Sequence, residues 1–268
     1  MKRRYDIVYS ITAHECPECV QQLYDNIIRY NAGLRVLVVF HINEALHAVV
    51  DSIPSHDNLL FNPTRTDKAR FTASIFLAHL DNYRFVKGID FGLFCTLASN
   101  SLFVRQVDME HIEANTPALA VGPTGYSLGD TETWSADEFV KNEALVALFK
   151  ERDIKVEVAI HFGAYFRKET MGFIAAFCEQ YGITTEIFPN DKIAAEEIVL
   201  SSLEKYATGR VAKRYAVWLP TMTMEDVKEL IETGGCRDSA DKHYTIIRVG
   251  REETNEIRKM ITQTEHAS

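Results

Sequence analysis

Two apolar runs with a helical stretch between them constrain the fold of this chain most. Residues 7–13 are typical of a buried strand, and residues 35–42 form a second run that is rich in β-branched side chains and almost entirely apolar. Such a run is typical of a parallel strand covered on both faces. The stretch 17–30 predicts a helix, with Pro17 in its first turn. This order predicts an α/β fold with a mixed, mostly parallel sheet flanked by helices.

Three of the expected strands lead into residues that are candidates for ligand binding. The strands are 7–13, 58–61 and 91–98, and a helix over 72–83 precedes the last of them. In open α/β sheets, ligands bind outside the carboxyl ends of the strands, so we expect these ends to meet at one cleft. The residues at these ends are Ala13, His14, Ser99 and Asn100, together with the segment after the strand 58–61.

The second half of the chain continues the alternation of strands and helices after a loop over 115–134. A capping box of Ser135 and Glu138 opens an expected helix over 135–151. Further strands are expected over 156–161, 215–219 and 244–249, and further helices over 168–181, 191–208, 223–234 and 252–263.

Two adjacent acidic residues stand out within the expected helix 191–208, which Asp191 caps and Gly209 ends. At about 100° per residue, one apolar stripe forms on this helix. Its members are Ile193, Val199, Leu200, Leu203 and Tyr206. Glu196 falls inside the stripe and Glu197 at its margin. A carboxylate there needs a partner, a cavity or a proton, and it is a candidate general base as well as a candidate structural carboxylate at a helix start.

The composition is that of an ordinary globular protein, with 268 residues, 46% hydrophobic residues and 25% charged residues. A net charge of −9 argues against a nucleic-acid-binding protein. The five scattered cysteines, including the pair Cys16 and Cys19, predict reduced thiols and a cytoplasmic location. No run suits a signal peptide or a membrane span, so we expect a soluble protein that can still contact a membrane surface.

Basic side chains, rather than a glycine-rich loop, are the candidates for binding phosphate groups. The sequence contains neither G-x-x-x-x-G-K-[ST] nor G-x-G-x-x-G. The candidates are Arg65, Lys68, Arg70, Lys213, Arg214, Arg248 and Arg251. Arg248 interrupts the end of an apolar strand, which predicts either a phosphate partner or an ordinary salt bridge for its guanidinium.

A metal site has one candidate, because no D-x-D motif occurs and the nearest acidic cluster holds Asp108 and Glu110. These oxygens could bind Mg²⁺ or Mn²⁺, although such a cluster is more often a solvated turn. Among the nine histidines, His79 is expected to be packed and hydrogen-bonded inside a helix. His161, at the end of an expected strand, is the better site candidate.

Three short stretches resemble the core-2/I-branching N-acetylglucosaminyltransferase-like glycosyltransferases, family 14, in a divergent bacterial form. Residues 195–203 resemble the family's Pro-Asp-Glu segment, whose Glu is the general base, and this assigns the role to Glu197. Residues 161–169 are similar to the acceptor-side strand and the following S-R-E helix start. Residues 244–249 resemble the late F-A-x-K-F strand, whose basic residue contacts the donor diphosphate, and this assigns that role to Arg248.

The resemblance implies a single GT-A-like, Rossmann-like domain over 1–268, with a donor half of about 1–110 and an acceptor and catalytic half of about 111–268. It implies inverting transfer from a nucleotide sugar, most simply a UDP-sugar, to a carbohydrate or glycolipid hydroxyl in polysaccharide biosynthesis, with no essential metal. Glu197, with Glu196 beside it, would be catalytic. The donor would contact Ala13, His14, Arg65, Ser99, Asn100, Arg214, Arg248 and Arg251, and the acceptor would contact His161 and Tyr165.

The chain departs from the family pattern at several positions. Ala195 replaces the proline of Pro-Asp-Glu. Residues 97–100 stand near the place of the family's Ser-Gly-x-Asp motif, but its Asp is absent. The family has a second arginine that contacts the diphosphate, and Arg214 is only the nearest counterpart of it. Two alternatives therefore remain open. One is a metal-dependent transferase that uses Asp108 and Glu110, and the other is a non-catalytic protein of the same fold that binds nucleotides or carbohydrates.

Overall fold

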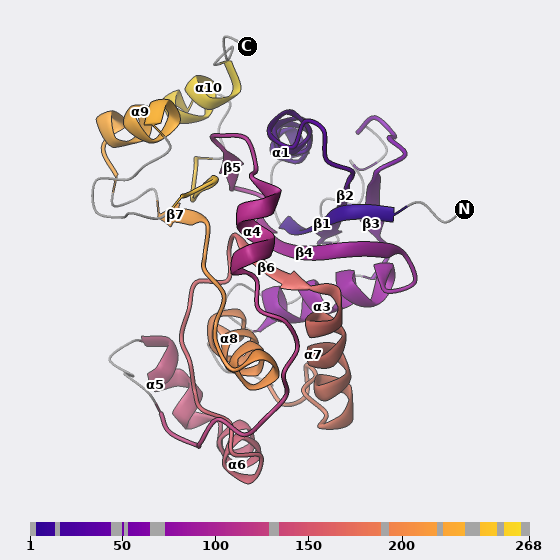
Figure 1. Cartoon of the computed structure of the whole chain (residues 1–268), viewed down its shortest axis with the longest axis vertical. Coiled ribbons are helices and arrows are strands. Elements are labelled where there is room, and N and C mark those ends of the chain that lie inside the picture. The colour runs from indigo at the N-terminus through magenta and orange to yellow at the C-terminus, as the bar shows by residue number, and fades with distance from the viewer. Residues whose placement is uncertain are drawn as a thin grey trace.

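A five-stranded, mostly parallel sheet forms the centre of the molecule in the computed structural model (Figure 1). The structure describes residues 4–13, 17–43, 50, 53–64, 73–128, 134–188, 193–218, 222–233, 242–250 and 255–263. The sheet has the order β3-β2-β1-β4-β6, in which only β6 is antiparallel to its neighbour. The strands are β1 (Arg4–Ala13), β2 (Val36–Ile42), β3 (Leu59–Asn62), β4 (Asp90–Ala98) and β6 (Ala164–Arg167). The α/β class and the mostly parallel sheet predicted from the sequence are confirmed.

The register of the sheet aligns the carboxyl ends of the four parallel strands. Thr12 of β1 pairs with His41 of β2 on one side and with Ala98 of β4 on the other. His41 in turn pairs with Asn62 at the end of β3. The strands therefore end at one common edge, which we call the carboxyl edge.

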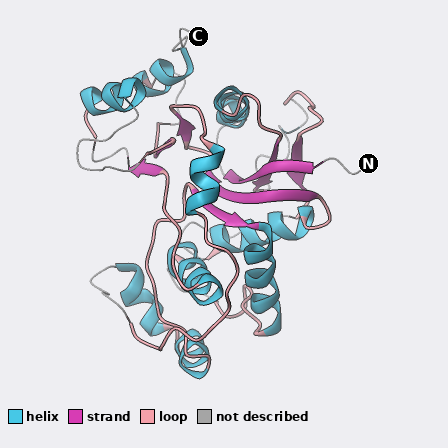
Figure 2. Cartoon of the chain, in the orientation of Figure 1, coloured by secondary structure: helices cyan, strands magenta, loops and turns pink. Residues whose placement is uncertain are grey.

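Helices cover both faces of the sheet and bury alternate side chains of each strand (Figures 1 and 2). The helix α1 (Pro17–Tyr30) packs on the face that carries Tyr9 and Ile11. The opposite face, which carries Val8, lies against α3 (Ser74–Val86), α7 (Lys168–Gln180) and α8 (Ala195–Thr208). Burial of the strands on two sides explains why their sequences are almost continuously apolar.

A second, three-stranded sheet lies beside the carboxyl edge, in the order β5-β8-β7 (Figure 1). Its strands are β5 (Leu102–Phe103), β7 (Ala216–Trp218) and β8 (Thr245–Ile247). The helices α9 (Met224–Thr233) and α10 (Glu256–Gln263) follow β7 and β8, and α4 (Met109–Asn115) follows β5. A backbone hydrogen bond of 3.0 Å from Val249 N–H to the Asn100 carbonyl joins the end of β8 to the end of β4.

The single helix predicted over 135–151 is wrong, because two helices occupy this stretch. They are α5 (Trp134–Lys141) and α6 (Glu143–Glu151), separated by Asn142. The side chain of Asn142 caps α6 by accepting a hydrogen bond of 3.1 Å from Leu145 N–H, and its amide donates to the Ile187 carbonyl at 2.8 Å. At an N-cap position the backbone is not helical, because the asparagine side chain accepts a hydrogen bond from the next helix. The capping role of Asn142 therefore explains why α5 does not continue into α6.

The strand predicted over 156–161 is also wrong, because this segment lies along α8 without joining a sheet. Its backbone N–H groups donate to α8 instead: Glu157 to Ser202 Oγ at 2.9 Å and Ala159 to the Glu197 carbonyl at 3.1 Å. A turn at Gly163, with φ of 66°, then directs the chain into β6 on the free edge of β4. The residues whose sequence predicted a strand thus form an extended segment that is hydrogen-bonded to a helix instead of to a neighbouring strand.

Candidate functional site

A layer of buried polar side chains lies at the carboxyl edge on the face covered by α3. Along β1 and β4, the positions that face α3 change from apolar residues to hydroxyl-bearing residues near the end of each strand, because alternate residues share a face. The members of this polar layer are Ser10, Thr12, Asn62, His79, Asn82 and Thr96, and all are buried.

Hydrogen bonds connect most of this polar layer. The amide of Asn82 donates to Ser10 Oγ at 3.0 Å and accepts a hydrogen bond of 3.0 Å from Asn62 Nδ2. Ser10 Oγ also lies 2.8 Å from Nδ1 of His79. The prediction that His79 is a packed, hydrogen-bonded histidine is therefore confirmed.

His161 lies next to the polar layer, with its ring centroid 5.7 Å from that of His79. Thr96 Oγ1 donates to the His161 carbonyl, and the side chain of His161 is 1% exposed. Burial, followed by the nearby His79 and Arg214, lowers the pKa of His161 well below its ordinary value. The imidazole is therefore neutral at physiological pH.

Several buried atoms around this point lack hydrogen-bond partners among the residues that the structure describes. They include Thr12 Oγ1, Ser99 Oγ, and both ring nitrogens of His161. The backbone N–H of Ser99 donates to the Thr12 carbonyl at 3.0 Å, so the two hydroxyl residues are neighbours. An unsatisfied buried polar atom costs about 1–3 kcal/mol, so such a concentration indicates a place where a ligand or ordered water supplies the missing bonds.

The two acidic residues of α8 differ in burial as the helical periodicity predicts. The side chain of Glu196 is 7% exposed, whereas Glu197 is partly exposed. Burial, followed by the charge of Glu197, raises the pKa of Glu196 to about 8. Glu196 therefore carries its proton at neutral pH.

The first turn of α8 lies at the same edge as the polar layer. The Ile193 carbonyl, just before α8, accepts a hydrogen bond of 3.4 Å from Ala73 N–H, at the N-terminus of α3. Ala159, whose N–H donates to the Glu197 carbonyl, is only two residues from His161. Glu197 and His161 are thus brought near each other by one short segment of chain.

Asn100 and Val249, the residue after Arg248, are joined at the junction between the two sheets. The hydrogen bond from Val249 N–H to the Asn100 carbonyl places the residue after Arg248 beside the end of β4. Arg248 is exposed and has a positive φ of 64°, which is uncommon for a residue with a side chain. Of the strand ends predicted to converge, those of β1 and β4 lie together, because Ser99 N–H donates to the Thr12 carbonyl, and Ala13 is buried at the same edge.

Arg214 is held by partners within the protein. Its Nη2 lies 2.8 Å from Glu204 Oε2, in an ion pair whose carboxylate side chain is 1% exposed, and its Nε donates to the Ile160 carbonyl at 2.8 Å. These bonds tie the segment before β7 to α8 and to the segment that leads to His161. The guanidinium predicted to contact the donor thus has an intramolecular carboxylate partner.

Tyr165 lies on β6, and its side chain is 1% exposed. It packs on the α1 face, with its hydroxyl 3.4 Å from that of Tyr9. The side chain predicted to line an acceptor site is therefore part of the core. The other predicted contacts His14, Arg65 and Arg251 lie outside the described residues.

The acidic cluster considered as a metal site has other partners. Asp108 caps α4 by accepting a hydrogen bond of 3.0 Å from His111 N–H, and its second oxygen lies 2.9 Å from Lys242 Nζ. These bonds lower the pKa of Asp108, and Glu110 is exposed. Within the described ranges, no group of three or more His, Cys, Asp or Glu side chains is arranged to hold a metal ion.

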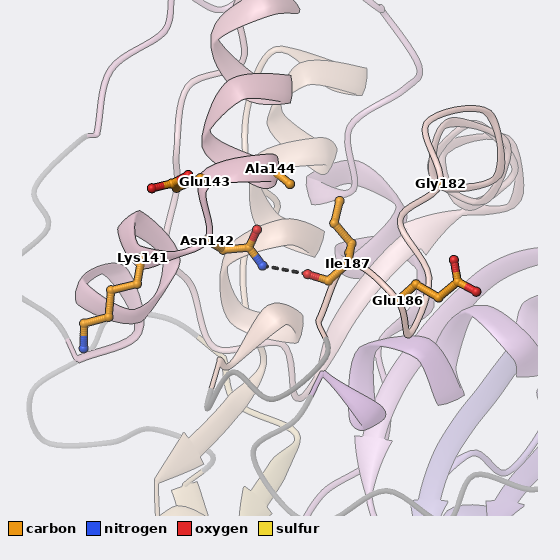
Figure 3. A pocket seen from close by; sticks show the side chains of 7 residues that line it. All are labelled: Lys141, Asn142, Glu143, Ala144, Gly182, Glu186 and Ile187. Carbon is orange, nitrogen blue, oxygen red and sulfur yellow. Dashed lines mark hydrogen bonds between the residues drawn. The ribbon is translucent and has the colours of Figure 1, made fainter.

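A separate hollow of about 530 Å³ lies between α6 and the turn after α7 (Figure 3). Figure 3 shows Asn142 and Ile187 joined across it, with the carboxylates of Glu143 and Glu186 at its sides. The hollow is open and shallow, and it contains none of the predicted site residues.

Sequence reasoning missed the polar layer itself. The signal that could have found it is the appearance of polar residues at alternate positions of apolar strands, at Ser10 and Thr12 in β1 and at Thr96 in β4. In the described part of the chain, no helix is long and apolar enough to cross a membrane. Comparison of the sequence with models of known families and with curated proteins found no match.

Proposed function

We propose that the protein is an inverting glycosyltransferase with a GT-A-like form of the α/β fold. It moves a sugar from a nucleotide sugar, most simply a UDP-sugar, to a hydroxyl of a carbohydrate or glycolipid acceptor. The acceptor oxygen attacks the anomeric carbon, its proton goes to Glu197, and the bond from that carbon to the diphosphate oxygen breaks. Arg248 stabilises the negative charge of the departing diphosphate.

The observation that supports the proposal most is the pair Glu196 and Glu197 in the first turn of α8, beside the polar layer. Burial raises the pKa of Glu196 to about 8, which favours its protonated form at neutral pH and makes it the weaker candidate for taking the acceptor proton. Glu197 is partly exposed and is therefore the better base of the two. The neutral ring of His161, with unsatisfied nitrogens, suits hydrogen bonds to sugar hydroxyls.

The donor and the metal requirement are tested first by thermal unfolding. UDP-, GDP-, CMP- and dTDP-sugars are added with and without Mn²⁺, and a tightly bound donor raises the melting temperature by mass action. We expect a nucleoside-diphosphate sugar to stabilise the protein, with activity that persists in excess chelator. Activity that disappears with chelator and returns with Mn²⁺ would support the metal-dependent alternative built on Asp108 and Glu110.

The catalytic assignment is tested with Glu197→Gln, which keeps the size of the side chain and removes the base. With the donor found above and a mixture of saccharide acceptors, release of nucleoside diphosphate should fall by about 10²–10⁴-fold. Glu179→Gln, at an exposed position near the end of α7, is the matched control and should retain full turnover. Undiminished turnover of Glu197→Gln would rule out this residue as the base.

A second candidate function is a protein of the same fold that binds nucleotides or carbohydrates without catalysis. The ion pair of Arg214 with Glu204 favours it, because one guanidinium assigned to the leaving diphosphate already has a carboxylate partner. Donor binding without transfer or hydrolysis, across the acceptor mixture, is the result expected for this candidate. Formation of any glycosylated product excludes it.

A further inference from the structure

A fully buried guanidinium near the carboxyl edge has no acidic partner among the residues that the structure describes. Arg258 of α10 is 1% exposed. Its Nε donates to the Gly250 carbonyl and its Nη1 to Gln22 Oε1, both at 2.8 Å. Its Nη2 is buried without a hydrogen-bond partner, and no carboxylate among the described residues forms an ion pair with it. The guanidinium carries a positive charge, and the two acceptors that it contacts in the described part of the chain are both neutral.

Arg214, another largely buried arginine, has an acidic partner. Arg214 is paired with the buried carboxylate of Glu204 at 2.8 Å. Burial of a charge is expensive unless an opposite charge or a ligand compensates it. The absence of an acidic partner for Arg258, within the part of the chain described, therefore points to an anion that comes from outside the protein.

The surroundings of Arg258 hold its guanidinium in a fixed position. Asn255 caps α10 by accepting a hydrogen bond of 3.0 Å from the backbone N–H of Arg258. The side chain of Asn255 also packs on Gly250, where a Cβ atom would lie only 2.4 Å from Asn255 Nδ2. A side chain at position 250 would therefore clash with Asn255, and the Gly250 carbonyl accepts the hydrogen bond from Nε.

The chain connects this corner to the end of β4, on the side of the sheet that α1 covers. Gly250 follows Val249, whose N–H donates to the Asn100 carbonyl just after β4. Gln22 lies on α1, which begins close to the carboxyl end of β1. Arg258 thus connects α10, α1 and the end of β8 beside the edge where ligands bind in open α/β sheets.

We propose that Arg258 is an anion-binding residue whose Nη2 donates to an oxygen of a phosphate group. Neutral acceptors fix Nε and Nη1, so the remaining donors and the charge are available to a tetrahedral anion. The ligand class is a phosphate or diphosphate ester. The diphosphate form rests on the proposed function, because a nucleotide sugar carries this group, whereas the anion site itself does not require sugar transfer.

The test is thermal unfolding of the full chain with inorganic phosphate, pyrophosphate and UDP, in the wild type and in Arg258→Met. We expect at least one of these anions to raise the melting temperature of the wild type, and we expect Arg258→Met to lose that shift. Without anion, the variant should melt at the same or a higher temperature, because an uncompensated buried charge has been removed. A shift in the wild type that Arg258→Met retains, or the absence of any shift in the wild type, overturns the proposal.

The matched control is Arg29→Met. Arg29 joins the same pair of helices through a hydrogen bond of 2.9 Å from Nη1 to the Thr262 carbonyl, but its side chain is exposed. This variant should keep the anion-induced shift. If Arg258→Met does not fold, Arg258→Lys is measured by calorimetry instead, because lysine keeps the charge and loses the planar fork. The Kd of whichever of the three anions stabilises the wild type most should then rise by about tenfold. An unchanged Kd overturns the proposal.

The three anions distinguish the source of the phosphate group. A shift with UDP alone assigns the site to a nucleoside diphosphate, and a shift with all three assigns it to the phosphate group itself. Both results support the site when Arg258→Met loses the shift. Failure of the anion-site proposal can be distinguished from failure of the proposed function. Anion binding is measured without an acceptor, whereas transfer is measured with Arg258 intact.

Discussion

Glu196 and Glu197 show how two identical neighbours acquire different chemistry from burial alone. They are one residue apart on α8, and the 100° rotation between them turns Glu196 into the core and leaves Glu197 at the margin. The low polarity around Glu196 favours its neutral form, because a buried carboxylate loses its hydration. Glu196 then adds no second negative charge to the place where Glu197 would accept a proton.

The raised pKa of Glu196 has a consequence for folding stability. The carboxyl binds its proton more tightly in the folded chain, with a pKa of about 8, than in the unfolded chain, where its pKa has the ordinary value of 4.5. Glu196 therefore favours folding at acidic pH, and this contribution is lost as the pH rises between these two values. Glu196→Gln removes the effect, so its stability relative to the wild type should grow by roughly 1.4 kcal/mol per pH unit across this window, as an upper bound.

Urea unfolding at pH 5, 7 and 9 measures this difference. Glu179→Gln, at an exposed position, is the control and should show the same small difference from the wild type at all three values. A stability difference for Glu196→Gln that does not change with pH would contradict a raised pKa at this position.

At the scale of the elements, periodicity was informative wherever a helix or strand packs against the sheet. The two apolar strands, the helix between them and the buried position of Glu196 all follow from patterns of period 2 and 3.6 in the sequence. The segment 156–161 has the composition of a strand, yet its backbone N–H groups donate hydrogen bonds to residues of α8. Which partner a segment meets depends on tertiary packing, and this information is absent from local patterns.

Asn142 illustrates the same limit for helices. The residues on both sides of it favour a helix, so local propensity predicts one continuous helix. The break depends on the carbonyl of Ile187, which is distant in sequence and accepts the Asn142 amide. Asn142→Ala removes this bond and the cap of α6, and we expect it to lower the free energy of unfolding by about 1–2 kcal/mol.

Chemical denaturation of Asn142→Ala measures this loss. Asn115→Ala is the matched control, since the amide of Asn115 donates only to the His111 carbonyl within its own helix, and it should cost less. Equal stability of Asn142→Ala and the wild type would show that the α5–α6 break does not depend on this side chain.

At the scale of the whole molecule, the candidate site depends on contacts between distant parts of the chain. Sequence reasoning predicted that the ends of the parallel strands converge, because this follows from the sheet alone. It did not predict that Arg214 pairs with Glu204 or that Tyr165 lies in the core, because both depend on which elements become neighbours. The unpaired charge of Arg258 is likewise visible only once α10 is placed against α1.

The central claim is that a nucleotide sugar binds at the carboxyl edge, between the polar layer and the first turn of α8. Hydrogen exchange, with and without the donor that stabilises the protein most, tests it directly. We predict slower exchange in peptides that cover residues 96–101, 159–163 and 195–199, with no change over 142–151. Protection confined to the hollow between Asn142 and Ile187, or an unchanged exchange pattern at the carboxyl edge, would contradict the claim.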